Sequence, residues 1–192
     1  MRTLVLHETT ASTIKSVAPS IVPGLLQIEG YARAMIGLVD GRSQAEIDSW
    51  VDVRMERQAV TKKWRPPTFT YFLCESALRC PIGGNPVMNE QMLHLAFLAG
   101  RPQMTIRVVP FSAAAYASAM GEFTFMDFAD HGRVVYLVNM LAGLFVESAE
   151  DVAVTRANLE RVAWDALSEE ESLEFLAQVA RAYDRQPDEG AQ

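Results

Sequence analysis

The sequence predicts a single α+β domain in which one antiparallel or mixed β-sheet is packed by amphipathic helices. Three short β-type segments follow one another at residues 122–128, 133–140 and 144–147, joined by turns too short to hold crossover helices. Amphipathic segments at residues 148–167 and 168–184 predict two helices, because each begins with a serine capping pattern. Strands grouped together and then helices are typical of the α+β class, and they disfavour a parallel nucleotide-binding fold.

The first half of the chain predicts two helices followed by a strand. A Pro-Gly turn at residues 23–24 leads into a helix expected at residues 27–39. Ser43, with Glu46 three residues later, forms a capping box that opens a second helix, which a Pro-Pro pair ends. Apolar and polar residues then alternate over residues 68–76, as in a half-buried strand.

The remaining segments complete the predicted domain. A glycine-containing loop leads into a helix at residues 86–99, and a β-branched segment at residues 104–111 predicts another strand. The alanine-rich segment at residues 112–120 is expected to be a linker. We place the domain at residues 1–186 and expect a disordered tail at residues 187–192.

The composition, with 49% hydrophobic and 21% charged residues, is that of an ordinary globular protein. No apolar run approaches the roughly 18 residues that cross a bilayer, and the N-terminus lacks a signal-peptide pattern. We therefore expect a cytoplasmic protein without a membrane partner. The net charge of −7, with acidic residues concentrated after residue 146, disfavours nucleic acid as a partner because its phosphates would be repelled.

The cysteines and histidines do not predict a metal site. Cys74 and Cys80 lack C-x-x-C spacing, and the three histidines are scattered along the chain. Two reduced thiols are the simplest interpretation in a cytoplasmic protein. We expect neither a metal nor a cofactor.

Three polar residues occupy positions where the patterning predicts apolar ones. The apolar stripe of the second helix continues into Arg54 and Gln58, and the inward face of the strand ends in Glu75. Burying an isolated charge is very costly, so an inward carboxylate and guanidinium should pair. The Arg54–Glu75 pair is then either a structural ion pair or the floor of a pocket. If no cation reaches Glu75, burial would raise its pKa and suit it to acid–base chemistry.

The predicted sheet is rich in aromatic side chains, including Tyr71, Phe123 and Tyr136. Core packing accounts for such residues, but part of this surface could instead line a cavity for a flat or hydrophobic ligand. The nine methionines favour the second interpretation slightly, since thioethers suit adaptable pockets.

Several motifs, in order along nearly the whole chain, are similar to those of one family. The matching positions are VPGLLQ at residues 22–27, Tyr31 with Ala32 and Arg33, Arg54 with Arg57 and Gln58, Glu75 with Ala77, Leu78, Pro81, Gly83 and Gly84, Gln91, residues 108–111, Phe123 with Thr124, Val135 with Tyr136, and Ala166, Leu167, Ser168, Glu171 and Ser172. They resemble the uncharacterised C-terminal effector domain of actinobacterial XRE-type, antitoxin-like helix-turn-helix transcriptional regulators. The resemblance implies a partner-binding or ligand-sensing module that acts beside small partner proteins and controls development or secondary metabolism.

The chain also departs from that family. It begins almost where the effector domain begins, so we expect a stand-alone protein without the DNA-binding domain. Cys74 stands at a position that is usually acidic in the family, and Val138 and Asn139 replace a glutamate-containing step. A pocket that loses charge in this way could be retuned for a hydrophobic small molecule.

Two functional hypotheses follow. The first is a stand-alone relative of the effector domain that binds a small hydrophobic ligand or a small partner protein, does not bind DNA, and could form a homodimer. The second is a cofactor-free biosynthetic enzyme, an isomerase or cyclase acting on a hydrophobic natural-product intermediate. The candidate catalytic residues are Glu75, Arg54 and Tyr136, and the candidate ligand-binding residues are Tyr31, Arg57, Gln58, Tyr71, Gln91 and Phe123.

Overall fold

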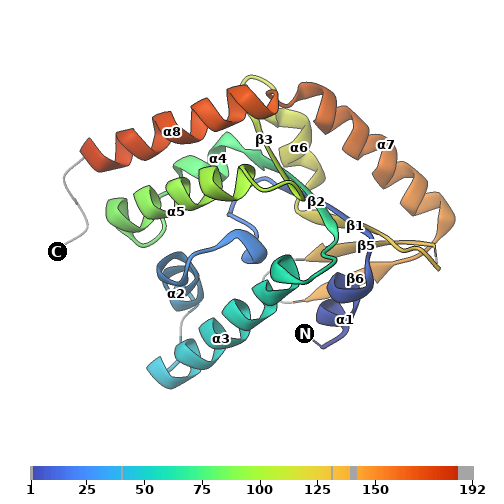
Figure 1. Cartoon of the computed structure of the whole chain (residues 1–192), viewed down its shortest axis with the longest axis horizontal. Helices are drawn as coiled ribbons and strands as arrows, with labels where there is room; N and C mark the ends of the chain where they lie inside the picture. The colour runs from blue at the N-terminus through green and yellow to red at the C-terminus, as the bar shows by residue number, and fades with distance from the viewer. Residues whose placement is uncertain (1, 40, 131, 139–141, 186–192) are drawn as a thin grey trace.

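The computed structural model describes residues 2–39, 41–130, 132–138 and 142–185, which form one sheet with helices on both faces (Figure 1). The tail expected at residues 187–192 lies outside the described residues. In chain order the elements are α1 Arg2–Thr10, β1 Thr13–Ala18, η1 Gly24–Leu26, α2 Glu29–Gly37, α3 Gln44–Arg57, η2 Gln58–Lys62, β2 Thr68–Cys74, α4 Glu75–Arg79, α5 Gly84–Ala99, β3 Met104–Val109, α6 Ala114–Met120, β4 Phe123–Asp127, β5 Arg133–Val138, β6 Gly143–Val146, α7 Ala149–Asp165 and α8 Glu169–Arg185, where η marks a 3₁₀ helix.

The strands of the described residues form one mixed sheet in the order β3-β2-β1-β4-β5-β6. β1, β2 and β3 are parallel, whereas β4, β5 and β6 are each antiparallel to the strand before them in the sheet. The predicted α+β class, the mixed sheet and the antiparallel pairing of the last three strands are therefore confirmed. The parallel half is possible because helices α2 and α3 connect β1 to β2, and α4 and α5 connect β2 to β3.

Three parts of the structure differ from the prediction. Local sequence patterns predict neither α1 nor β1. β1 is hard to recognise because it is central, with apolar residues buried on both faces and Ser16 interrupting them. The expected linker at residues 112–120 contains helix α6, in agreement with the high helix propensity of alanine and the burial of Ala114 and Ala117. The strand expected to continue to residue 76 ends at Cys74.

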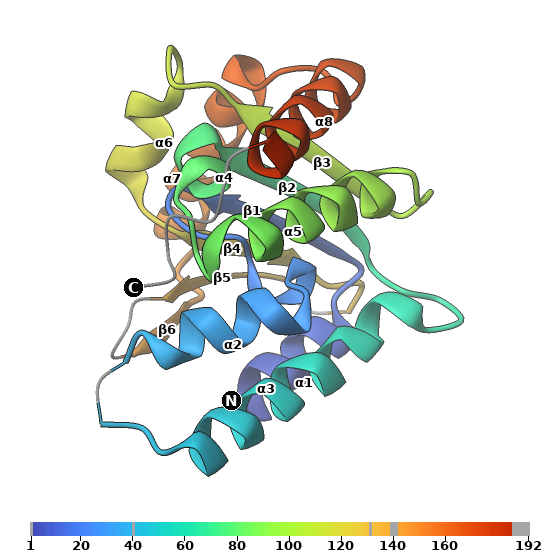
Figure 2. The same ribbon diagram turned by 90° about the vertical axis from the view of Figure 1, so that its left-hand side faces the viewer.

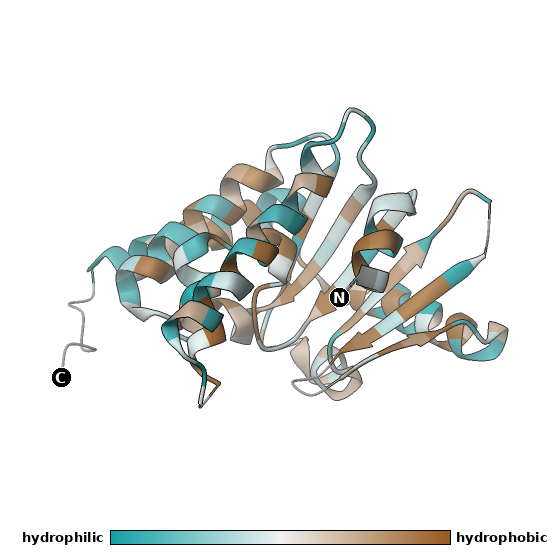
Figure 3. Ribbon diagram, turned by 90° about the horizontal axis from the view of Figure 1, so that it is seen from below, coloured by the Kyte–Doolittle hydropathy of each residue, from teal (hydrophilic) through white to brown (hydrophobic). Residues whose placement is uncertain are grey.

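Each face of the sheet carries its own hydrophobic cluster. On the first face, α5 and α8 pack beside η1 and α2 over the parallel strands, and α1 lies next to the C-terminal end of α3 (Figures 1 and 2). On the second face, α6 and α7 cover residues of β1, β2, β4 and β5. Figure 3 shows hydrophobic residues along the strands and alternating hydrophobic and hydrophilic stretches on the helices. In the described part of the chain, no helix has the length and apolar character needed to cross a membrane.

The predicted serine caps are present at three helices. Ser43 and Glu46 make the two reciprocal bonds of a capping box at α3. Ser168 and Glu171 make the same pair of bonds at α8, and Ser148 accepts a bond from the first turn of α7. These caps fix where the covering helices begin, and so where their inward faces meet the sheet.

The outer edge of β3 is closed by the segment that enters α8. Leu167 donates its backbone N–H to the carbonyl of Val108 at 2.8 Å, and the N–H of Val108 donates to Ser172 Oγ at 2.9 Å. Ser172 is fully buried. This edge therefore presents a satisfied backbone at its centre, which removes a site for unwanted strand pairing.

The Ser172→Ala variant is expected to lose about 1–3 kcal/mol of unfolding free energy, because the buried N–H of Val108 loses its acceptor. Urea denaturation measures the change. The control is Ser118→Ala, at an exposed position of α6, which should change stability by less than about 0.5 kcal/mol. Equal stability of Ser172→Ala and the wild type would show that the Ser172 bond contributes nothing.

Candidate functional site: a buried polar cluster

A row of polar side chains crosses the first face of the sheet. The register aligns Tyr71 of β2 with Ser16 of β1, Ser16 with Thr124 of β4, Thr124 with Tyr136 of β5, and Tyr136 with Phe145 of β6. Ser16 Oγ and Thr124 Oγ1 are 3.0 Å apart and share a hydrogen bond. The neighbouring row on the same face is apolar and contains Met104, Phe69, Ile14, Met126 and Val134. Hydroxyl groups thus replace apolar side chains along one line of an otherwise hydrophobic surface.

Glu8 of α1 and Arg57 of α3 add opposite charges above this row. Arg57 Nε lies 3.3 Å from Glu8 Oε2, and the two side chains are only 15% and 7% exposed. The ion pair lacks hydrogen-bond geometry, and Glu8 Oε2, Arg57 Nε and Tyr71 Oη are all buried without a hydrogen-bond partner. Buried polar atoms are nearly always paired in folded proteins. Three buried polar atoms without a hydrogen bond, from three different elements, therefore mark this place as unusual.

Burial and charge act together on these groups. Burial raises the pKa of Tyr71, the Glu8 carboxylate raises it further, and Arg57 lowers it. Burial also raises the pKa of Glu8, and the attraction of Arg57 only partly opposes that effect. Because Tyr71 is affected by both charges, its hydroxyl lies in the field of the same ion pair.

Glu122 and Tyr136 extend the polar region toward the antiparallel strands. Burial raises the pKa of Glu122 to about 7, and the charges of Arg54 and Arg57 lower it. Burial likewise raises the pKa of Tyr136, while Arg57 lowers it and Glu8 and Glu122 raise it. These six residues form what we call the polar cluster: Glu8, Arg54, Arg57, Tyr71, Glu122 and Tyr136.

The end of α3 also holds the loop around η1. Arg54 Nη1 donates to Gln27 Oε1 at 2.6 Å, and Gln58 Nε2 donates to the carbonyls of Gly24 and Gln27 at 3.0 and 2.7 Å. Gly24 lies against the end of Arg57, because a Cβ at this position would come within 2.7 Å of Arg57 Nη2 and the guanidinium would have to shift. The R-x-x-RQ and VPGLLQ motifs therefore form one contact in space.

The predicted Arg54–Glu75 ion pair is wrong. Because β2 ends at Cys74, Glu75 begins α4 and leaves the inward register of the strand. Its carboxylate pairs with Arg79 at 2.6 Å and accepts the N–H of Phe111 at 2.9 Å. Glu75 thus joins α4 to the end of β3, while Arg54 bonds to Gln27 instead.

The other predicted site residues separate into two groups. Arg54, Arg57, Tyr71 and Tyr136 meet in the polar cluster, and Gln58 lies beside it through its bonds to the η1 loop. The three remaining ligand-binding candidates serve the fold. The hydroxyl of Tyr31 accepts the N–H of Val22 at 3.1 Å, and the side-chain amide of Gln91 bonds to the backbone of Ile28 and Leu26 at 2.9 and 2.8 Å. Phe123 is buried in the hydrophobic cluster on the opposite face of the sheet.

Sequence reasoning missed Glu8 and Glu122, and only Glu8 carries a clear signal. Glu8 lies one turn after Leu4 and three residues before the buried Ala11, so it falls on the inward stripe of α1. That signal could not be used without first recognising α1. Glu122 lies at a bend directly before β4, where no strand or helix pattern predicts the direction of its side chain.

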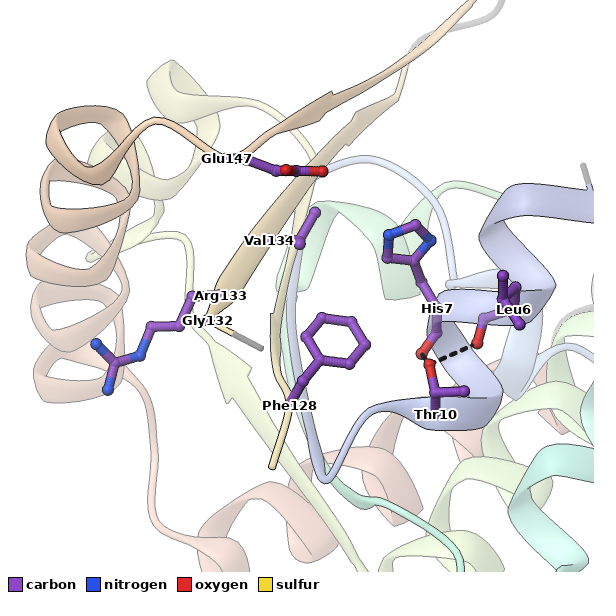
Figure 4. A pocket seen from close by; sticks show the side chains of 8 residues that line it. All are labelled: Leu6, His7, Thr10, Phe128, Gly132, Arg133, Val134 and Glu147. Atoms are coloured by element: carbon purple, nitrogen blue, oxygen red, sulfur yellow. Dashed lines mark hydrogen bonds between the residues drawn. The ribbon is translucent and has the colours of Figure 1, made fainter. Parts of the chain in front are cut away.

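A cleft of about 440 Å³ lies beside the polar cluster, between α1 and the ends of β4, β5 and β6. Its lining residues are Leu6, His7, Thr10, Phe128, Gly132, Arg133, Val134 and Glu147. Figure 4 shows His7, Phe128, Val134 and Glu147 around the opening, with the guanidinium of Arg133 directed away from it. Arg133 pairs instead with Asp127 at 2.7 Å.

An aromatic wall connects this cleft to the polar cluster. The His7 ring stacks on Phe145 with centroids 4.6 Å apart, and Phe145 contacts the Tyr136 ring at 4.7 Å. The Tyr136 ring lies directly over Gly143, where a Cβ would come within 2.6 Å of the ring carbons. Glycine at this position is therefore a condition for the observed place of Tyr136.

The Gly143→Ala variant should destabilise the domain by about 1–3 kcal/mol, the usual range for overpacking. In the Tyr136→Leu background the same substitution should be nearly neutral, because the ring that would clash with the new Cβ is absent. A thermodynamic cycle of these variants, measured by urea denaturation, gives the coupling. Independent effects of the two substitutions would contradict the close packing of Tyr136 on Gly143.

Among the described residues, no group of three His, Cys, Asp or Glu side chains is placed to hold a metal ion. Fold and site together define an α+β domain with a buried, partly unsatisfied polar cluster beside an open cleft. The chain belongs to the family DUF5753, a domain of unknown function, whose model matches residues 1–178. No curated protein and no solved structure matches the chain.

Proposed function

We propose that this domain binds a small molecule at the polar cluster, as a relative of the effector domains of XRE-type, antitoxin-like regulators. The observation that carries the proposal is the burial at one place of three polar atoms without a hydrogen bond, namely Tyr71 Oη and the facing ion-pair atoms Glu8 Oε2 and Arg57 Nε. A buried hydroxyl without a partner costs the folded protein on the order of 1–3 kcal/mol. A ligand that bonds to Tyr71 Oη and gives the ion pair hydrogen bonds would recover this free energy.

The same arrangement offers a way for a ligand to affect the rest of the domain. Arg57 Nη2 lies against Gly24, and the next residue, Gln58, donates to the carbonyls of Gly24 and Gln27. A ligand that draws the Arg57 guanidinium toward itself would therefore act on the η1 loop. A small partner protein could bind that loop and so respond to the ligand. We do not expect DNA to be a partner, because the net charge of −7 opposes phosphate binding.

Tyr71→Phe tests the proposal, because it removes one unpaired hydroxyl and leaves the ring. We expect the variant to be at least as stable as the wild type, since a buried polar atom without a partner is lost. It should also bind polar fragments about tenfold more weakly in a screen read by NMR of ¹³C-labelled tyrosine. Tyr116→Phe, at α6 on the opposite face, is the matched control and should bind like the wild type.

One result would contradict the proposed ligand site. A crystal structure of the wild type could show one ordered water bonded to all three atoms, with no fragment bound at that position. Together with an empty fragment screen, this would make the cluster a hydrated structural feature and overturn the proposal.

A cofactor-free isomerase or cyclase is the second candidate, and the surroundings of Glu122 favour it. Burial raises the pKa of Glu122 to about 7, against the lowering effect of Arg54 and Arg57, and the charge of Glu122 in turn raises the pKa of Tyr136. A carboxyl that titrates near neutral pH can both give and take a proton. Glu122 would thus fill the catalytic role that the sequence predicts for Glu75. If this candidate is correct, Glu122→Gln abolishes turnover of a bound intermediate, as measured by mass spectrometry. The affinity of the variant for that intermediate should stay unchanged.

A further inference from the structure

We infer that the cleft beside α1 and the polar cluster are two halves of one elongated site for an uncharged amphiphile, an apolar molecule that carries a hydroxyl or primary amide group. This inference rests on the proposed function and adds the ligand class and the place of its apolar body. Three features support it: the two halves share elements, the cleft has an apolar lining, and the cluster holds charges of both signs.

Two of the elements that line the cleft, α1 and β5, continue into the cluster. On α1, His7 lines the cleft and the next residue, Glu8, faces Arg57. On β5, Val134 lines the cleft, and Tyr136 follows two residues later on the same face, about 7 Å along the strand. Phe145 contacts both the His7 and the Tyr136 rings, so it forms the wall that the two halves share. None of the six cluster residues lines the cleft, so a molecule of two fused rings would reach the cluster by displacing the Phe145 ring.

The cleft suits an apolar body. Its volume of about 440 Å³ falls within the usual range of small-molecule sites, about 300–1,000 Å³. Leu6, Phe128 and Val134 supply apolar walls (Figure 4). The polar atoms of α1 in the lining are already used within the helix, since His7 Nδ1 bonds the carbonyl of Thr3 at 2.8 Å and Thr10 Oγ1 bonds the carbonyl of Leu6 at 2.9 Å.

The head group must suit a cluster that holds two arginines and two glutamates. Arg54 and Arg57 oppose a cationic group, whereas Glu8 and Glu122 oppose an anionic one. The atoms without a hydrogen bond include an N–H donor on Arg57, an acceptor on Glu8 and a hydroxyl on Tyr71 that can both donate and accept. A hydroxyl or primary amide both donates and accepts, so it can satisfy all of them without adding charge.

Four probes that share one ring system test the inference. They are 2-naphthalenemethanol, 2-methylnaphthalene, 2-naphthoate and 2-naphthylmethylammonium, titrated below their solubility limits and followed by ligand-observed NMR. The alcohol should bind the wild type about tenfold more tightly than each of the other three. Thr10→Trp places a large side chain at the cleft and should weaken binding of the alcohol by about tenfold or more. Thr3→Trp, also exposed on α1 but outside the lining residues, should not.

The outcomes separate this inference from the proposed function. Binding that is weakened by Tyr71→Phe but not by Thr10→Trp would keep the cluster as a site and remove the cleft from it. Tightest binding of the carboxylate or the ammonium probe would overturn the uncharged head group. Sensitivity to Thr10→Trp alone would remove the cluster, and with it the proposed function. If no probe binds the wild type, the inference fails, and the fragment screen decides on the proposed function by itself. Circular dichroism verifies that each variant is folded.

Discussion

Arg57→Met is expected to lower the free energy of unfolding by about 3–5 kcal/mol, the range for removing one partner of a buried ion pair. The side chains of Arg57 and Glu8 are 15% and 7% exposed, so water does little to screen them. The variant leaves the Glu8 carboxylate buried beside Tyr71 without its closest compensating charge. Urea denaturation near neutral pH, followed by circular dichroism, measures the loss.

The double variant Glu8→Met with Arg57→Met should recover most of that loss. Replacing a buried ion pair by apolar side chains of similar volume is often neutral or stabilising, because the desolvation of both charges is avoided. Arg65→Met, at an exposed position after α3, removes one positive charge without leaving a buried partner and should change stability by less than about 0.5 kcal/mol. A double variant as unstable as Arg57→Met would show that the ion pair itself stabilises the fold.

These variants also separate structure from binding. If the double variant is folded and stable but no longer binds fragments, the charges are not kept for stability. Their retention would then reflect a role in recognition, which is the expected relation between stability and function at a binding site. The Tyr71→Phe variant should show the same pattern on a smaller scale.

The sequence predicted most of the fold where local signals were strong. Serine caps placed α3, α7 and α8, and the closely spaced strands after Gly121 required antiparallel neighbours. β1 could not be found this way, because a central strand buried on both faces does not alternate and Ser16 faces the core through a hydrogen bond to Thr124. Only its partners, β2 and β4, reveal it as a strand.

The candidate site was predicted in part, for a similar reason. The inward direction of Arg54 and Gln58 followed from helix periodicity, and both side chains do bond inward. Their partner is the loop at Gln27, far along the chain, and no local pattern identifies it. Glu75 was assigned wrongly because the end of a strand is uncertain by a residue or more, and a one-residue difference decides which way the side chain points.

The stability of the wild type relative to Glu122→Gln should decrease as pH rises from about 4.5 to about 7. Burial raises the pKa of Glu122 from its ordinary value of 4.5 to about 7, against the lowering effect of Arg54 and Arg57. A carboxyl with a higher pKa in the folded state binds its proton more tightly there, so it stabilises the fold fully below the unfolded pKa. That contribution is lost as pH rises through the folded pKa, whereas glutamine does not titrate. Urea denaturation of both proteins at several pH values gives the difference in their unfolding free energies. The contributions of all other titrating groups are the same in both proteins and cancel in this difference.

Glu46→Gln provides the opposite case within the same protein. Hydrogen bonds from Ser43 in the capping box lower the pKa of Glu46, so its contribution is present above the ordinary value of 4.5 and is lost only as pH falls below it. Between pH 4.5 and 7 the difference between the wild type and Glu46→Gln should therefore be constant. A constant difference for Glu122→Gln as well would mean that Glu122 is ionised throughout, so that the two arginines outweigh burial. Glu122 would then be a poor proton donor near neutral pH, and the acid–base candidate would lose the observation that favours it, while the binding proposal would stand.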